Sequence, residues 1–442
     1  MTDTTTDKEL KRVIGVTGLA SNMVNITIGA GIFVLPAIVG LQLGAFGVFG
    51  YLFCGLMLAI IMLCYAEIGS RITTAGGSYA YIEAAFGNFA GFISNWLLLF
   101  GWCLLGDAAL MNIIADSLAV MFPVFLNPWY RGLLFFVLIS IIIFINVRGA
   151  KNGVVFVKLI TLVKLLPLLG IIIFGMGKID TANLHWEHLP SLDTFGNAAL
   201  VLFFAFAGFE TALGISGEIK NPKRTVPLGI LTGGLLILTI YMLLQIVTQG
   251  ILGAKMELVQ DAPLAAVAEQ IIGPIGGTVL IIAAILSCFG TVSGDVLASP
   301  RMLYAGAQNG MFPRFLGKVH PKFATPYWAI YCFGAVLFTL SVAGGFKQLA
   351  ILASAAILLV YLAVILATIK MRSKKQGADE KSFKIPGGLI IPIVGIFTIV
   401  WLLTSLSKWE VLSAVIFIAA ICAIYFVMKK LKKEKVPDTT KK

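Results

Sequence analysis

Long apolar runs separated by short polar segments repeat along the whole chain. Each run approaches or exceeds the roughly 20 residues that an α-helix needs to cross the hydrocarbon core of a bilayer. The runs are continuous rather than alternating over about ten residues, which argues against β-barrel strands. The pattern predicts an all-α membrane protein with twelve spans. They are expected at residues 13–38, 44–69, 89–121, 131–147, 153–176, 196–217, 226–252, 274–304, 325–343, 347–370, 388–406 and 410–428.

The composition agrees with a membrane environment. The chain has 442 residues, of which 59% are hydrophobic and only 12% are charged, whereas a soluble domain has about 25% charged residues. Its net charge of +12 would suggest nucleic acid as the partner of a soluble protein. Here the basic residues lie in short loops between apolar runs, so we expect the lipid bilayer and no nucleic acid as the partner.

The distribution of basic residues predicts how the spans are oriented. With the N-terminus in the cytoplasm and alternating spans, only five of the 33 lysines and arginines fall outside. These five are Arg131, Lys178, Lys255, Lys347 and Lys408. Apart from one lysine inside a span, the others lie at or near the cytoplasmic face, as the positive-inside rule requires. We therefore expect a multi-pass protein of the cell membrane, with a membrane domain at 13–428 and cytoplasmic tails at 1–12 and 429–442.

Two spans carry signals for a break in the middle of the membrane. The first contains Gly29 and Gly31 on either side of Ala30, and the sixth contains Gly208 followed closely by Glu210. Glycine weakens a helix, and transporters built from inverted repeats interrupt corresponding helices near the midplane. Spans one and six would be the leading helices of two five-helix halves. The alternative is that the glycines only allow helices to pack closely.

Two facing breaks would suit a zwitterionic ligand. Peptide N–H groups freed at the start of a half-helix attract a carboxylate. Peptide carbonyls freed at the end of a half-helix attract an ammonium group. An amino acid carries both groups on one carbon atom, so it is the substrate class that this arrangement favours.

Several motifs together resemble those of the amino acid–polyamine–organocation superfamily, and within it the permeases related to L-type amino acid transporters. They occur in that family's order over most of the chain. The motifs are Gly29-Ala30-Gly31-Ile32-Phe33, Ala75-Gly76-Gly77-Ser78-Tyr79-Ala80-Tyr81, Asn146-Val147-Arg148-Gly149, the run TLVKLL at 161–166, the stretch from Phe206 to Pro227, Ser287-Cys288-Phe289-Gly290, and the stretch from Arg301 to Pro326.

The resemblance implies a LeuT-like fold of five helices plus five inverted helices, working by alternating access. The first repeat would occupy 13–176, the second 196–370, and two additional helices 388–428. Carried over by position, the residues around the two breaks would bind the substrate. The N–H groups of Ala30 and Gly31 would face its carboxylate, the carbonyls of Thr27, Phe204 and Ala207 its ammonium, and the ring of Phe204 would cover the pocket.

Lys164 is the most unusual charged residue. It lies about 11 residues into the fifth span, or roughly 16 Å from its start, where a lysine costs at least ~2.5 kcal/mol. Burial makes the protonation of a lysine responsive to its surroundings. In Na⁺-independent relatives a lysine at this position resembles a replacement for sodium between spans one, five and eight. Lys164 either couples transport to protons or serves as a fixed cation that braces the helices.

Two carboxylates within predicted spans are candidates for the site. Glu210 follows the second break, where it would gate the site or handle protons, or else pair with a polar neighbour. Asp107 lies in the third span, which lines the side-chain pocket in relatives. It would receive a cationic side chain, pair with Lys164, or face a water-filled vestibule.

These observations favour a secondary active amino-acid transporter that works by Na⁺-independent proton symport or by exchange. The alternatives are an antiporter of cationic amino acids or polyamines with the same fold, and a sensor that binds amino acids without moving them. No nucleophile–base pair or phosphate loop indicates an enzyme. His185, Glu187 and His188 are too few for a zinc site, so we expect no metal or cofactor. No cysteine lies in the predicted outer loops, so we expect no covalently bound partner subunit.

Overall fold

The computed structural model describes residues 15–29, 31–72, 77–148, 153–186, 188–209, 220–308, 312–373 and 383–434. The predicted N-terminal tail at 1–12, the end of the basic tail beyond 434, and Glu187 lie outside the described residues. All regular elements of the described residues are helical. The α-helices are α1 (Val16–Thr27), α2 (Leu35–Leu43), α3 (Gly47–Arg71), α4 (Gly77–Phe86), α5 (Asn88–Trp96), α6 (Leu105–Met121), α7 (Pro128–Arg148), α8 (Gly153–Gly175), α9 (Leu192–Phe206), α11 (Pro222–Leu252), α12 (Pro263–Ile272), α13 (Pro274–Gln308), α14 (Tyr327–Ala343), α15 (Phe346–Ser373), α16 (Ile390–Thr404) and α17 (Lys408–Glu434).

Many of these helices are long and apolar enough to cross a bilayer. Seven helical stretches of the described residues qualify by length and hydropathy, and four shorter apolar helices accompany them. One of the seven, Leu35–Arg71, contains α2 and α3 with a turn at Gly44, where φ is +57°. Large apolar side chains also face outward, including Trp129 at 86% exposure and Phe397 at 71%. The protein is therefore an integral membrane protein, whereas the count of twelve spans and the inverted repeat remain predictions.

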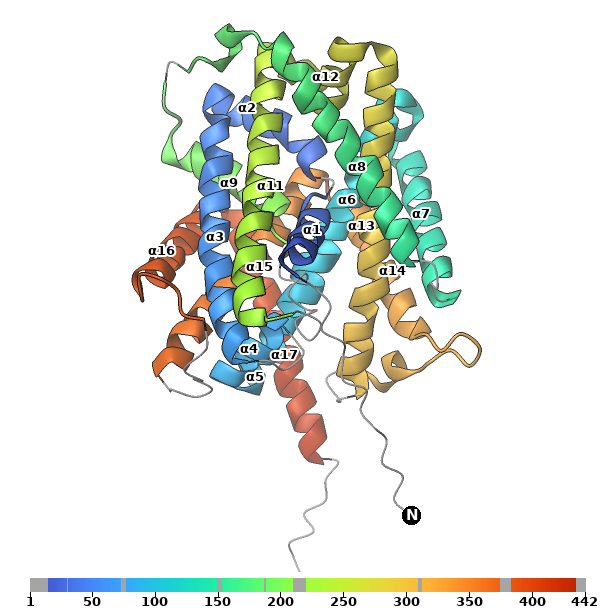
Figure 1. Cartoon of the computed structure of the whole chain (residues 1–442). Helices are drawn as coiled ribbons and strands as arrows, with labels where there is room; N and C mark the ends of the chain where they lie inside the picture. The colour runs from blue at the N-terminus through green and yellow to red at the C-terminus, as the bar shows by residue number, and fades with distance from the viewer. Residues whose placement is uncertain are drawn as a thin grey trace, which may run out of the picture.

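The helices stand side by side in one bundle, with α1 near its middle (Figure 1). Helix α1 packs against α11, and α9 packs against α2, α3 and α15. Helix α8 lies against α13 and α11. The short helix α12 lies at one end of the bundle, and α4 and α5 lie at the other (Figure 1). The two elements that the sequence predicts to be interrupted, α1 and α9, are thus surrounded by other helices.

A buried carboxylate, Glu67 near the end of α3, organises the α4 end of the bundle. Its Oε1 accepts hydrogen bonds from Arg71 at 2.8 Å and from Nε of Arg372 on α15 at 2.6 Å. Its Oε2 accepts from a second nitrogen of Arg372 and from the peptide N–H of Ile385 at 3.0 Å. Glu67 is 0% exposed, so these contacts compensate a charge that has lost its water. They join α3, α15 and the segment leading to α16.

Candidate functional site

The first predicted break is present in the structure. Helix α1 ends at Thr27, Ile28 has ψ of 77°, and helical structure resumes with the short 3₁₀ turn η1 (Gly31–Phe33), which leads into α2. The N–H of Ile28 still bonds to the carbonyl of Val24, at 2.9 Å, but the N–H of Gly29 turns back to Thr27, at 2.7 Å. The chain therefore has a helix C-terminus and a helix N-terminus close together within one predicted span.

The second predicted break is also present. Helix α9 ends at Phe206, Ala207 is extended with ψ of 165°, and Gly208 has φ of +105°. That conformation lies in the region that side-chain-bearing residues rarely adopt. The N–H of Ala207 bonds to the carbonyl of Phe203 at 3.1 Å, which closes the last turn of α9. Glu210 lies outside the described residues, so its predicted role is not addressed by the geometry.

A single tyrosine connects the ends of the two interrupted helices. The hydroxyl group of Tyr241, on α11, lies 3.0 Å from the carbonyl oxygen of Thr27 and 2.9 Å from that of Ala205. It has one proton to donate, so the two carbonyls share it. Tyr241 is 0% exposed, and its ring packs edge-on against Phe206 with centroids 5.1 Å apart. Tyr241 therefore fixes the position of the last turn of α1 relative to the last turn of α9.

A cavity of about 100 Å³ lies between the two breaks. Both breaks contribute to its wall, and α6 and α13 supply the opposite side. The lining residues are Ile26, Thr27, Gly29, Gly31, Trp102, Cys103, Gly106, Asp107, Leu110, Phe204, Ala205, Ala207, Gly208, Thr291 and Asp295. The structure therefore brings together five of the residues predicted from the sequence, namely Thr27, Gly31, Asp107, Phe204 and Ala207. Ala30 lies outside the described residues.

Lys164 contacts the first break from α8. It is 4% exposed, and its Nζ donates a hydrogen bond to the carbonyl oxygen of Asn25 at 2.5 Å. Asn25 belongs to the last turn of α1, whose carbonyls lack helical partners and form the negative end of the helix dipole. The predicted link to the first helix is thus observed. The predicted link to span eight is not seen as a hydrogen bond among the described residues, although α8 packs against α13.

The ring of Phe204, which lines the cavity, packs against two other aromatic rings. Its ring lies 5.6 Å from that of Trp102 and 5.9 Å from that of Phe346, measured between centroids. Phe346 in turn lines a cavity of about 550 Å³ near the start of α15, which is lined also by Asp116, Asp261, Lys347 and Glu410. The contact between Phe204 and Phe346 therefore joins the walls of the two cavities, and the role of Phe204 as a cover over the pocket stays a prediction.

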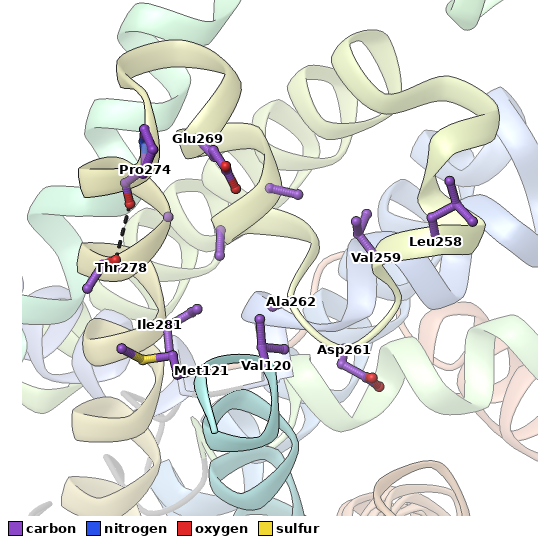
Figure 2. A pocket seen from close by; sticks show the side chains of 13 residues that line it. Val120, Met121, Leu258, Val259, Asp261, Ala262, Glu269, Pro274, Thr278 and Ile281 are labelled. Atoms are coloured by element: carbon purple, nitrogen blue, oxygen red, sulfur yellow. Dashed lines mark hydrogen bonds between the residues drawn. The ribbon is translucent and has the colours of Figure 1, made fainter. Parts of the chain in front are cut away.

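A further cavity, of about 360 Å³, lies between α12, the end of α6 and the start of α13 (Figure 2). Apolar side chains form most of its wall, including Val120, Val259 and Ile281. Its two carboxylates, Asp261 and Glu269, are exposed residues. Neither break contributes to this wall, so the smaller cavity between the breaks is the better candidate for a binding site.

Sequence reasoning missed two residues of this site. Asp295 on α13 lines the cavity, and a carboxylate within an apolar span is the same kind of signal that drew attention to Lys164. Tyr241 had no such signal, because one tyrosine in an apolar helix is ordinary. A third feature is the π-helix over Leu97–Leu104, which immediately precedes α6 and holds Trp102 and Cys103. Such segments are frequent at functional sites because they redirect side chains.

Comparison with known proteins agrees with this geometry. A family of amino acid permeases matches residues 13–432. The serine/threonine exchanger SteT of Bacillus subtilis is 30% identical over 97% of this chain and 99% of its own length. The branched-chain amino acid permease BcaP of Lactococcus lactis is 27% identical over 97% of each chain. A methylthioribose transporter of Bacillus subtilis is 26% identical over 96% of this chain and 94% of its own length.

The family match covers nearly all of the described helices, including both interrupted ones and the cavity between them. The relatives named above are permeases, exchangers and transporters rather than enzymes. The chain therefore belongs to the amino acid permease family of integral membrane transporters.

Proposed function

We propose that the protein is a secondary active amino-acid transporter that works by alternating access around the cavity between the two breaks. The observation that carries this proposal is the pair of interrupted helices, α1 and α9, whose non-helical segments face one space. Peptide groups in these segments are already oriented to bind the charged ends of a small molecule, so no bound ion is needed to compensate those charges. The permease relatives support the same substrate class.

The substrate's α-carboxylate binds at the N-terminal end of η1, toward the peptide groups of Ala30 and Gly31. Its α-ammonium binds toward the carbonyl end of α9, at Phe204 and Ala207. The carbonyl of Thr27 already accepts from Gly29 and Tyr241, so it has little capacity left for the ammonium group. The side-chain hydroxyl of Thr27 is the better contact, because it is buried at the cavity and its Oγ1 has no hydrogen-bond partner in the part of the chain that the structure describes.

Replacing Thr27 by valine is expected to weaken substrate binding by about tenfold. Valine keeps the shape of threonine but cannot hydrogen-bond, and a lost bond to a charged group costs ~1.5–3 kcal/mol. The measurement is the KM for uptake by purified protein in proteoliposomes. Thr27→Ser retains the hydroxyl group and should stay within about threefold of the unsubstituted protein. Equal KM values for the valine and serine variants would remove Thr27 from the binding site.

Lys164 takes the place that a sodium ion would otherwise occupy beside the first break, which makes transport independent of sodium. Its contact with Asn25 exists in this arrangement of α1 and α8, and any movement of the first half-helix must break or carry that contact. Transport then proceeds either as proton symport, with Lys164 losing its proton during the cycle, or as exchange, with Lys164 charged throughout.

Lys164→Met tests these two roles. Methionine has similar bulk and no charge, so a coupling lysine predicts that uptake driven by an inward proton gradient falls at least tenfold and loses its dependence on pH between about 5 and 8. The measurement is initial uptake with and without the gradient. Unchanged pH dependence in a variant that still transports would assign Lys164 to bracing alone.

The proposed function is tested by uptake of labelled amino acids into proteoliposomes, with and without a proton gradient and with and without internal substrate. Accumulation that requires the gradient shows symport, and uptake that requires internal substrate shows exchange. Absence of both for every amino acid would refute the transporter.

We also propose that both termini lie on the cytoplasmic side of the cell membrane, because the basic residues gather at that predicted face. Labelling of cysteines introduced near each terminus, in intact and in opened cells, tests the orientation.

A further inference from the structure

Two carboxylates line the wall of the candidate site. Asp107 lies at the start of α6, directly after the π-helix, and Asp295 lies on α13. Both line the cavity between the breaks. Asp107 is 1% exposed, and no described residue donates a hydrogen bond to either of its oxygens. Asp295 retains some exposure.

This pair lacks the compensation that buried carboxylates ordinarily have. Neither aspartate takes part in an ion pair among the described residues. Lys164 is also buried, but its ammonium group donates a hydrogen bond to the carbonyl oxygen of Asn25. Two ionised carboxylates can only accept hydrogen bonds, and they repel each other at close range. The arrangement is satisfied by a positively charged group bound between them, or by a proton that they share.

The surroundings favour a bound organic cation. Trp102 lines the same cavity, and indole faces attract ammonium and guanidinium groups. The cavity of about 550 Å³ that Phe346 helps to line has three carboxylates in its wall, Asp116, Asp261 and Glu410, against one lysine. Asp116 is paired with Arg131 at 2.5 Å, which leaves two carboxylates to balance Lys347. A cation approaching from this side would be attracted toward the site.

We propose that Asp107 and Asp295 form an acidic subsite for the side chain of the substrate, and that the preferred substrates are amino acids whose side chain ends in an ammonium or guanidinium group. This inference rests on the proposed function, since it places the α-carboxylate and α-ammonium of the same molecule at the two breaks. The side chain then extends from the breaks across the cavity toward α6 and α13. A diamine without an α-carboxylate would fill the acidic subsite but leave the Gly31 end empty.

The test is competition against labelled L-lysine and labelled L-serine in proteoliposomes that contain the purified full-length protein. Matched pairs of competitors isolate the side-chain charge, namely lysine against norleucine and ornithine against norvaline. We expect each cationic member to compete at least tenfold better than its neutral partner, and cadaverine to compete more weakly than lysine. Neutral partners that compete equally well would overturn the acidic subsite while leaving an amino-acid transporter. No uptake of either label or of any other amino acid would refute the proposed function itself, and the subsite would fall with it.

Two variants test whether the preference for cationic side chains depends on Asp107 and Asp295. Asp107→Asn and Asp295→Asn are each expected to lower the preference for lysine over norleucine at least tenfold. Asp193→Asn, which removes an exposed carboxylate at the start of α9, should leave the preference unchanged. Equal losses of lysine and norleucine transport in both aspartate variants would overturn a side-chain role. Should either variant fail to fold by gel filtration, the competition between matched pairs in the unsubstituted protein still decides the proposal.

Discussion

Replacing Gly208 by valine is expected to abolish uptake, with a loss of at least a hundredfold in kcat/KM. Gly208 has φ of +105° and lines the cavity between the breaks. A β-branched residue at that dihedral angle is a steric outlier, and residues forced into sparsely populated regions cost ~1–3 kcal/mol. The added side chain must also be placed beside a space of only about 100 Å³. The measurement is initial uptake by purified protein in proteoliposomes.

A matched control separates the break from a general intolerance of glycine substitutions. Gly132 lies in α7, and a Cβ built on it meets no atom within 4 Å. Gly132→Val is therefore expected to keep uptake within about twofold. The proposed site requires the left-handed backbone conformation of Gly208. Normal transport by Gly208→Val would show that the second break forms without this conformation and would contradict the proposed site.

Replacing Glu67 by alanine is expected to have the largest effect on stability. The side chain is 0% exposed and binds Arg71, Arg372 and the N–H of Ile385. Removing one partner of a buried ion pair costs about 3–5 kcal/mol, because the remaining charge is left without compensation. We expect a large fall in the melting temperature of the purified protein, or failure to accumulate in the membrane.

The effect of Glu67 should be specific to its buried network. Glu257, in the 3₁₀ helix Gly253–Val259 before α12, is an exposed glutamate, so Glu257→Ala should leave the melting temperature nearly unchanged. A double variant that removes Glu67 and Arg372 together should recover part of the stability, because fewer buried charges remain unpaired. A melting temperature that does not fall in Glu67→Ala would show that the network contributes nothing to holding α3 and α15 together.

Much of the helical framework could be predicted from hydropathy alone. Every predicted span overlaps a helix of the structure, because twenty apolar residues in a row have few stable alternatives in lipid. The two breaks were also predictable, since Gly29 and Gly31 in one span and Gly208 in another weaken helices at comparable positions. These signals belong to single segments of sequence, which is why they can be recognised without the fold.

Features that depend on contacts between distant helices could not be predicted in this way. Tyr241 connects the carbonyls of Thr27 and Ala205, but nothing in its own helix distinguishes it from a lipid-facing or packing tyrosine. Asp107 and Asp295 line one cavity because α6 and α13 meet there, and nothing in the sequence around either residue indicates that the two helices are neighbours. The carbonyl oxygen of Thr27 accepts hydrogen bonds from both Gly29 and Tyr241. This sharing likewise becomes visible only once the positions of both residues are known.

In the proposed site, the peptide groups at the two breaks bind both charged ends of an amino acid. This is tested by competition of labelled substrate uptake by the free amino acid, its N-acetyl derivative and its methyl ester. Blocking either end is expected to lower competition at least a hundredfold, because a helix terminus then faces a neutral group. Equal competition by the free amino acid and both blocked derivatives would contradict it.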